Sequence, residues 1–397
     1  MKRQVVRETL AYMWRNKKNR LVIVLCFGAL LVHSLLILPN TRFHDEVDVV
    51  ALERSMDSNR QTFEDRLEEG LTVPTFMTGT SAYEIARNEY VNQRELLTAL
   101  KMGDVRRYLG ISYRPTSEER EFVPEEKPFT LLGYAKEEAF QSFKNNYYMD
   151  EVEQLNFHIV HERTSLQQLH LFLIGQGPYV LIFLLLFMVS DVVTKDRKLR
   201  TQKLGVPVNW FTYVLVQSLT AMGFFLVFAA ALAGFFILVN GLLYGFGTLN
   251  LPVGVFDLSP PEEGQFMVSM IVEAIGTYFV RVLPYSLLLM YGFTRLSSLF
   301  SLLVKHDVVV LILSVFVLMF PQLYYSPGTS ELFGVSATWF PQTYFHFGEV
   351  ASGRMALDLM TYTPYVRGLI VLVVTILVLE LLNWIVSKKI TRQAFIG

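Results

Sequence analysis

The sequence predicts an all-α polytopic membrane protein with six transmembrane helices, an N-terminal interfacial helix and a mainly helical extracellular domain. Three observations support this prediction. Hydrophobic residues make up 52% of the 397 residues and charged residues only 18%, against roughly 25% charged in an ordinary soluble domain. Six apolar runs approach the length of a membrane-crossing helix, and Lys and Arg are concentrated in alternate segments between them.

A helix needs about 20 mainly apolar residues to cross a hydrocarbon layer of ~30 Å, because each residue advances it by ~1.5 Å. The predicted transmembrane helices are residues 21–38, 169–190, 211–239, 270–293, 308–325 and 368–386. Basic residues precede the first run, as in a signal peptide, but Pro39 follows it and no small-x-small cleavage pattern is present. We therefore expect the first run to be a retained transmembrane helix.

Lys and Arg favour the cytoplasmic side of a membrane, so their distribution predicts the orientation. Residues 1–20 contain seven of them, residues 191–210 contain five and the tail 387–397 contains three, whereas residues 240–268 contain none. Both termini are therefore expected in the cytoplasm of a multi-pass protein of the cell membrane. The predicted cytoplasmic segments are 1–20, 191–210, 294–307 and 387–397, and the predicted extracellular segments are 39–168, 240–269 and 326–367.

The extracellular segment 39–168 is long enough to form a domain with its own core. Residues 40–168 hold 15 Lys and Arg against 24 Asp and Glu, a net charge of −9. Ser81 and Glu84 have the spacing of a capping box and precede apolar residues at helical spacing, which predicts a helix. Three prolines between 114 and 128 predict a loop there.

Residues 1–20 are expected to form an interfacial helix. Val6, Leu10, Met13 and Trp14 make an apolar stripe beside several Lys and Arg residues. A helix of this kind lies flat on the membrane, with its rings at the acyl boundary and its cations among anionic lipid headgroups. The alternative is a basic segment that only fixes topology.

Signatures of catalysis and of several ligand classes are absent from the sequence. There is no phosphate-binding loop, dinucleotide fingerprint, zinc-protease motif or nucleophile elbow. Cys26 is the only cysteine, and His158 and His161 beside Glu162 are expected to be solvated side chains and not metal ligands. The net charge of −1 argues against a nucleic-acid partner. We therefore expect no enzyme active site, cofactor or metal in this chain.

The loop 191–210 carries the most informative motif. An acidic residue, a cation, a hydroxyl residue, an apolar residue and a proline occur in that order, followed by Tyr213. The residues are Asp196, Arg197, Thr201, Leu204 and Pro207. Here the sequence resembles the permease subunits of type-2 ABC exporters, and the order of an interfacial helix, a first span, a large external insert and five further spans extends that resemblance over the whole chain.

The resemblance implies a transport subunit without its own ATPase site. A separate ABC ATPase subunit would bind ATP and Mg and would contact Asp196, Arg197, Thr201, Leu204 and Pro207. The permease would pair with a second copy or a related permease. A short charged helix docked on an ATPase would transmit a rigid-body movement to the spans that it joins. The alternative for the loop is a solvated basic segment. The lone cysteine favours a bacterial source.

Two further sets of residues are candidates for function. Ionisable residues inside predicted spans are costly and normally face protein or water, which singles out Glu273, Arg281 and Glu380. Eight residues separate Glu273 from Arg281, so they would not share one face of a helix cleanly, and pairing across helices or a dimer interface is favoured over contact with substrate. The segment 326–367 is rich in aromatic residues and is expected to be re-entrant or interfacial, the alternative being an ordinary interfacial aromatic belt. The resemblance to exporter permeases implies that this segment lies near the exit of the substrate, which makes Trp339, Phe340 and Tyr344 candidates for the exit region.

The leading hypothesis is therefore an ABC exporter permease whose substrate is a peptide, a lipid-linked molecule or another amphipathic compound. One alternative is a membrane sensor whose acidic extracellular domain binds a ligand. A second alternative is an intramembrane lipid-modifying enzyme, which would need clustered acids, histidines or serines at the interface.

Overall fold

The computed structural model describes residues 2–41, 46–74, 81–112, 144–152, 154–199, 209–258, 268–324, 330–359 and 363–396. The chain divides into two compact units. Unit 1 comprises Met1–Pro39, Pro124–Phe129 and Ser165–Gly397, and unit 2 comprises Asn40–Val123 and Thr130–Thr164. Predicted residues Thr201, Leu204 and Pro207, and the predicted loop 114–128, lie outside the described residues.

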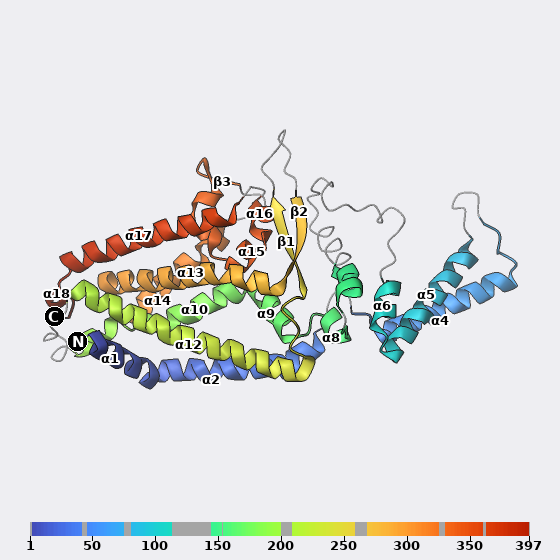
Figure 1. Ribbon diagram of the computed structural model, residues 1–397, viewed down its shortest axis with the longest axis horizontal. Helices are drawn as coiled ribbons and strands as arrows, with labels where there is room; N and C mark the ends of the chain where they lie inside the picture. Colours follow the sequence, from blue (N-terminus) through green and yellow to red (C-terminus); the bar gives the residue numbers. More distant parts are fainter. Residues whose placement is uncertain are drawn as a thin grey trace. The chain divides into compact units, whose positions relative to one another are not determined.

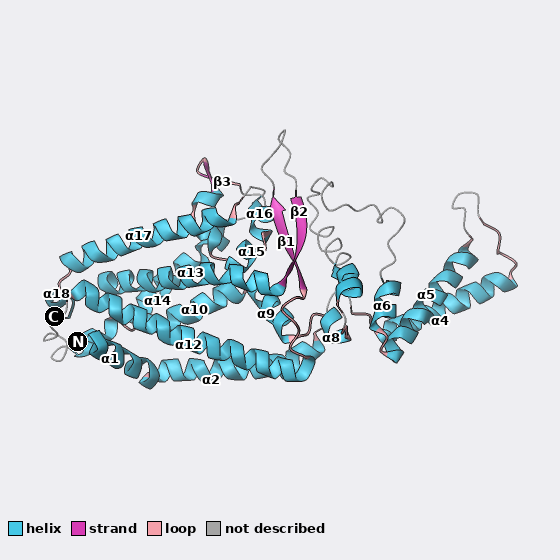
Figure 2. Cartoon of the chain, in the orientation of Figure 1, coloured by secondary structure: helices cyan, strands magenta, loops and turns pink. Residues whose placement is uncertain are grey.

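Unit 1 consists of long apolar helices with short helices and small hairpins at their ends (Figure 1, Figure 2). Its first elements are α1 (Lys2–Arg15), α2 (Lys17–Val32), the π-helical turn η1 (His33–Ile37), α3 (Leu38–Asn40), α9 (Ser165–Ile174), α10 (Gly177–Val189), the 3-10 helix η3 (Thr194–Leu199) and α12 (Trp210–Tyr244). Then follow β1 (Pro252–Leu258), β2 (Val268–Ala274), α13 (Ile275–Val304), α14 (Asp307–Tyr324), β3 (Glu331–Leu332), β4 (Val335–Ser336), η4 (Ala337–Trp339), η5 (Pro341–Tyr344), α15 (Phe347–Ala351), α16 (Arg354–Leu359), α17 (Tyr365–Lys389) and α18 (Arg392–Ile396).

Within the described residues, five helical segments are long and apolar enough to cross a membrane. They are Lys17–Asn40, Gly177–Arg197, Trp210–Tyr244, Ile275–Val304 and Tyr365–Lys389. A further apolar helix, Asp307–Gln322, is shorter. The chain is thus a helical protein compatible with several membrane crossings.

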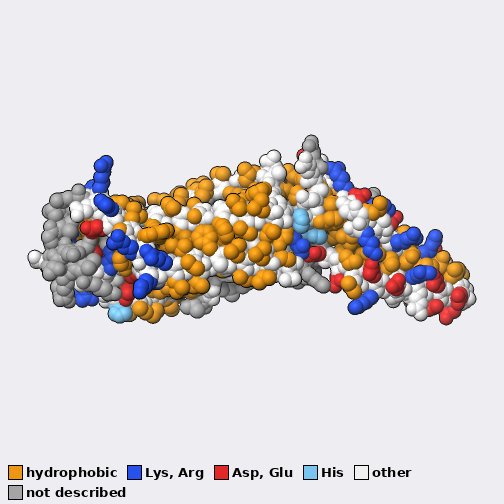
Figure 3. Space-filling view, turned by 90° about the horizontal axis from the view of Figure 1, so that it is seen from below, with side chains coloured by type: hydrophobic (Ala, Val, Ile, Leu, Met, Phe, Trp, Pro, Cys, Tyr) orange, Lys and Arg blue, Asp and Glu red, His pale blue; other side chains and the backbone are white. Residues whose placement is uncertain are grey.

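Helices α10 and α13 form the centre of unit 1. In the most apolar 18-residue stretches of these two helical segments, 67% and 56% of the residues are buried. The corresponding fractions are 11% for the segment that begins with α2 and 17% for α17. Helix α13 packs against α10, α12, α14 and α17. Figure 3 shows a face of unit 1 where apolar side chains cover the helices, with Lys and Arg gathered near the end that carries the termini. A surface of this composition suits contact with lipid between two aqueous layers.

The predicted span 169–190 is two helices and not one. Helix α9 ends at Ile174 and α10 begins at Gly177, with Pro178 in its first turn. Proline is favoured at the start of a helix because its missing N–H has no partner to lose there. Gly177 allows the turn to be tight, since a Cβ at this position would overlap the carbonyl of Phe172. Apolar composition did not reveal this break.

The predicted span 270–293 is also displaced along the chain. Its first residues belong to β2, which pairs antiparallel with β1 so that Val253 lies opposite Glu273. Helix α13 begins only at Ile275 and continues to Val304, so residues 294–304 are helical where a cytoplasmic loop was expected. A short apolar run with β-branched residues fits a strand as well as a helix, and pairing with β1 decides between them.

A π-helical turn lies near the end of the first long helix, and a hydrogen bond connects this turn to the end of α12. Pro39 lacks an N–H, so it cannot donate to a carbonyl of the preceding turn. The N–H of Leu38 bonds to the carbonyl of His33, five residues back. The next carbonyl, that of Ser34, accepts instead from the hydroxyl of Tyr244 at 2.9 Å. The end of α12 therefore satisfies a backbone group that proline leaves open.

Unit 2 contains α4 (Val49–Glu68), α5 (Ala82–Met102), α6 (Val105–Ser112) and α8 (Phe157–Val160). Helices α4 and α5 pack against each other through the ring of Phe63, which meets Tyr83 and Tyr90. The predicted capping box is confirmed: Ser81 accepts from the backbone N–H of Glu84, whose carboxylate accepts from the N–H of Ser81.

We expect Tyr244→Phe to lower the free energy of unfolding by about 1 kcal/mol, because the Ser34 carbonyl loses its donor in an apolar region. Ser34→Ala is the matched control. The Ser34 hydroxyl has no hydrogen-bond partner among the described residues, and the acceptor is the backbone carbonyl, which alanine retains. Thermal unfolding in detergent measures both, and equal losses in the two variants would contradict the assignment.

Candidate functional site

The carboxylate of Asp191, just after α10, contacts three polar side chains from the N-terminal region. Tyr12 donates its hydroxyl at 2.9 Å, Asn16 donates its amide at 2.7 Å, and the Lys18 ammonium lies 3.2 Å away. Asn16 also caps α2 by accepting from the N–H of Lys18. Because charge-assisted hydrogen bonds are among the stronger ones, Asp191 fixes α1 and the start of α2 to the end of α10.

Tyr12 remains a hydrogen-bond donor over the whole physiological pH range. Burial, reinforced by the negative charge of Asp191, raises the pKa of Tyr12 above its usual value. The ammonium of Lys195 lies 3.9 Å from the centre of the Tyr12 ring, a cation–π contact that links the residues after Asp191 to α1.

Asp196 and Arg197, predicted to contact an ATPase, both face the body of unit 1. Asp196 is fully buried and accepts from the amide of Gln217 in α12 at 3.3 Å. The same amide donates to the carbonyl of Val192 at 2.9 Å. Arg197 donates to the carbonyl of Lys305, just after α13, at 3.0 Å. These two side chains position the start of the loop on α12 and α13.

The C-terminal helix α18 closes this end of unit 1. Phe395 is fully buried against the ring of Trp210, in a cluster that also contains Val5 and Tyr213. The guanidinium of Arg392 lies about 5 Å from the rings of both Trp210 and Tyr213. Elements α1, α12, α13 and α18 therefore share one small core beside the loop.

Glu273 and Arg281 form an ion pair, in contrast to the expectation from sequence. Their side chains meet at 2.7 Å. Glu273 lies in β2 and Arg281 in α13, so the argument from faces of a single helix was wrong: the strand ahead of the helix brings the carboxylate back over the second turn. This pair has a structural role at the boundary of the apolar helix.

Glu380 belongs to a buried polar network that joins three apolar helices. It accepts two hydrogen bonds from the guanidinium of Arg295, which is fully buried in α13. Arg295 also donates to the hydroxyl of Ser218 in α12 at 2.9 Å, and Tyr291 donates to Glu380 at 2.6 Å. Asn383 in α17 donates to the backbone carbonyl of Arg295.

The three predicted exit residues do not form one site. Tyr344 is fully buried and donates to the carbonyl of Thr338 at 2.6 Å. Trp339 is 58% exposed, and the guanidinium of Arg367 lies 5.4 Å from its ring. Phe340, which follows Trp339 in the sequence, is half-buried. Trp339 can therefore meet membrane or ligand, whereas Tyr344 supports the segment from inside.

Glu349 in α15 is a half-buried carboxyl in the same segment. Burial, reinforced by Asp358 and opposed by Arg354, raises the pKa of Glu349 to about 7. The imidazole of His346 lies 3.7 Å away and accepts from the N–H of Glu349, and burial lowers the pKa of His346. Both side chains are therefore able to be neutral together near pH 7.

Sequence reasoning missed Arg295 and Asp191. Arg295 was assigned to a cytoplasmic loop because the predicted span ended at residue 293. The row of Thr294, Ser297, Ser298 and Ser301, all buried on α13, was the available signal for a polar helix face. Asp191 had no such signal, because its partners lie more than 170 positions away in the sequence.

Removing one member of the Arg295–Glu380 pair is expected to destabilise the protein strongly. Glu380→Leu leaves a buried guanidinium without its carboxylate, which typically costs about 3–5 kcal/mol of unfolding free energy. The double variant Arg295→Met/Glu380→Leu removes both charges and should lose less than Glu380→Leu alone. A thermodynamic cycle from detergent unfolding measures this, and a double variant that loses the sum of the two single effects would contradict the pairing.

Glu349→Gln tests the raised pKa. The folded state holds a proton on Glu349 up to about pH 7, whereas the unfolded chain releases it near its ordinary value of about 4.3. Wild-type stability contributed by this group therefore falls as pH rises from about 4.3 to about 7, by on the order of 3 kcal/mol. The melting temperature of Glu349→Gln relative to wild type should rise across this window. A constant difference between pH 5 and pH 8 would disprove it.

Comparison of the chain with family models, with curated protein sequences and with solved structures returns no match.

Proposed function

We propose that this chain is the permease subunit of an ABC exporter in the bacterial cell membrane, with six spans and both termini in the cytoplasm. A separate ABC ATPase subunit, which binds ATP and Mg, drives it through the loop 191–210. A second copy or a related permease completes the pathway. The apolar helix Asp307–Gln322 serves as the sixth span, aided by the residues that flank it.

The main support for the proposal is the set of hydrogen bonds that the first residues of the loop make with neighbouring helices. Residues 191–197 are bonded to α1 through Asp191, to α12 through Asp196 and to α13 through Arg197. Asn209, at the far end of the loop, caps α12 by accepting from the N–H of Phe211. A push on the residues between these two ends would reach three helices directly, which is what a mechanical link to an ATPase requires.

The surroundings support an amphipathic substrate. Trp339 and Arg367 present an exposed aromatic ring and a cation side by side near the start of α17. Such a pair suits a molecule with an apolar part and a polar or anionic head.

Co-purification with an ABC ATPase encoded beside this chain tests the proposal. Leu204→Ala, in the middle of the loop, should reduce recovery of the ATPase by about tenfold, because it removes an apolar contact worth about 1.4 kcal/mol or more. Leu303→Ala is the matched control, since Leu303 is 51% exposed in the last turn of α13.

Equal recovery of the ATPase with Leu204→Ala and Leu303→Ala would overturn the coupling role of the loop. Wild-type protein that retains no ATPase would overturn the transport function itself.

A further inference from the structure

We propose that the cavity between α13, α14, α17 and η5 binds an amphiphile that carries a hydrogen-bond donor, either a hydroxyl or an amide N–H, next to an apolar chain. The proposal deepens the proposed function, on which it rests for the idea that the ligand is a substrate. The site itself is argued only from the cavity.

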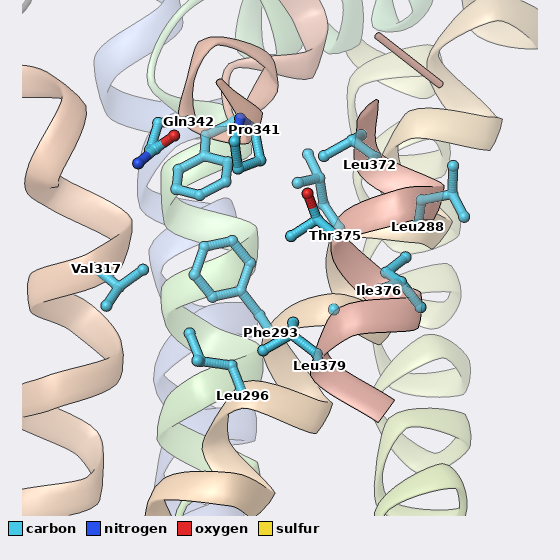
Figure 4. Close-up of a pocket in the computed structure, with 13 residues that line it drawn as sticks. Leu288, Phe293, Leu296, Val317, Pro341, Gln342, Leu372, Thr375, Ile376 and Leu379 are labelled. Atoms are coloured by element: carbon cyan, nitrogen blue, oxygen red, sulfur yellow. The ribbon is translucent and has the colours of Figure 1, made fainter. Parts of the chain in front are cut away.

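The cavity is apolar and of ligand size. Its volume is about 140 Å³, and it is partly open. An engineered protein cavity of ~150 Å³ lined by Leu, Ile and Phe remains dry and binds benzene. Apolar side chains such as Phe293, Val317, Leu372 and Leu379 line it, together with the polar side chains of Gln342 and Thr375. Figure 4 shows them converging from three apolar helices and the segment that contains Pro341.

One lining group lacks a partner. The side-chain carbonyl oxygen Oε1 of Gln342 is buried and accepts no hydrogen bond from any residue that the structure describes. Leaving a buried acceptor unsatisfied is unfavourable, so a ligand that donates to it binds more tightly than one that does not. Gln342 stands beside Pro341 at one end of the group of side chains in Figure 4.

Water is a poor donor for this oxygen. A buried water needs about two to four polar partners. Among the described lining residues, Thr375 is the other one with a polar side chain, and its hydroxyl already donates to the carbonyl of Val371 at 2.8 Å. A water at Gln342 would therefore have only the accepting oxygen of Thr375 as a second partner among these side chains, the minimum that a buried water needs.

The chemistry of the cavity selects among membrane molecules. An acyl chain alone fills the apolar part and leaves the oxygen of Gln342 unsatisfied. An apolar side chain of another protein would do the same. A long-chain alcohol, a hydroxylated lipid or an N-acylated compound satisfies both the apolar walls and the acceptor. Helices α14 and α17 also carry exposed apolar residues such as Phe316 and Leu377, against which the rest of a chain can lie.

Photocrosslinking with a diazirine-labelled hexadecanol tests the site in the full-length protein purified in detergent. The methyl ether of the same molecule is the matched probe, because it keeps the chain and loses the donor. Mass spectrometry maps the labelled residues. The alcohol should label residues 341–345 and 372–379 about five- to tenfold more than the ether, which corresponds to one hydrogen bond.

Three variants sharpen the test. Gln342→Leu should reduce labelling by the alcohol to the level of the ether. Gly292→Leu should abolish labelling by both probes, because its side chain fills the cavity; a Cβ at Gly292 itself is tolerated, since it meets Ile376 only at 3.6 Å. Gly234→Leu adds the same bulk at an exposed position of α12 with nothing within 4 Å and should change nothing.

Equal labelling by alcohol and ether in the wild type would overturn the proposal, as would equal labelling of Gly292→Leu and Gly234→Leu. If Gly292→Leu does not fold, Gln342→Leu decides alone. The assay needs no ATPase, so a positive result combined with failed ATPase co-purification would refute the transport function and leave the site intact.

Discussion

The buried guanidinium of Arg295 is the constraint on which the packing of the apolar helices depends. In a hydrocarbon environment a charged group has no water to bond with, and the protein must supply every partner. Glu380 from α17, Ser218 from α12 and the neighbouring Tyr291 supply them. The relative rotation of α12, α13 and α17 is therefore fixed by directional bonds, whereas the surrounding apolar contacts would tolerate several rotations.

A second polar centre performs the same task at the end that carries both termini. Asp191 holds α1, and Asp196 and Arg197 hold α12 and α13. The two centres share α12 and α13, in which Gln217 of the loop network is adjacent to Ser218 of the Arg295 network. A displacement of the loop would therefore act on α12 at a position next in sequence to the residue that accepts from Arg295.

The helical class and most of the apolar helices were predictable from composition and run length, because both properties are local. The capping box at Ser81 was predictable for the same reason. The strand that contains Glu273 was not, because the pairing with β1 that stabilises it involves residues about 20 positions earlier. The Arg295–Glu380 pair joins positions 85 apart, and only Glu380 was found, since it alone lay inside a predicted span. The orientation of Asp196 toward Gln217 likewise has no local signature.

The bond between Tyr244 and the carbonyl of Ser34 has a consequence for the order of biosynthesis. The two residues are separated by 210 positions, so a growing chain contains Ser34 long before its donor has been made. Until α12 has been made, the carbonyl of Ser34 needs water or another donor. The contact between the end of the first long helix and the end of α12 can form only after α12 has been synthesised, which makes it a late step of folding.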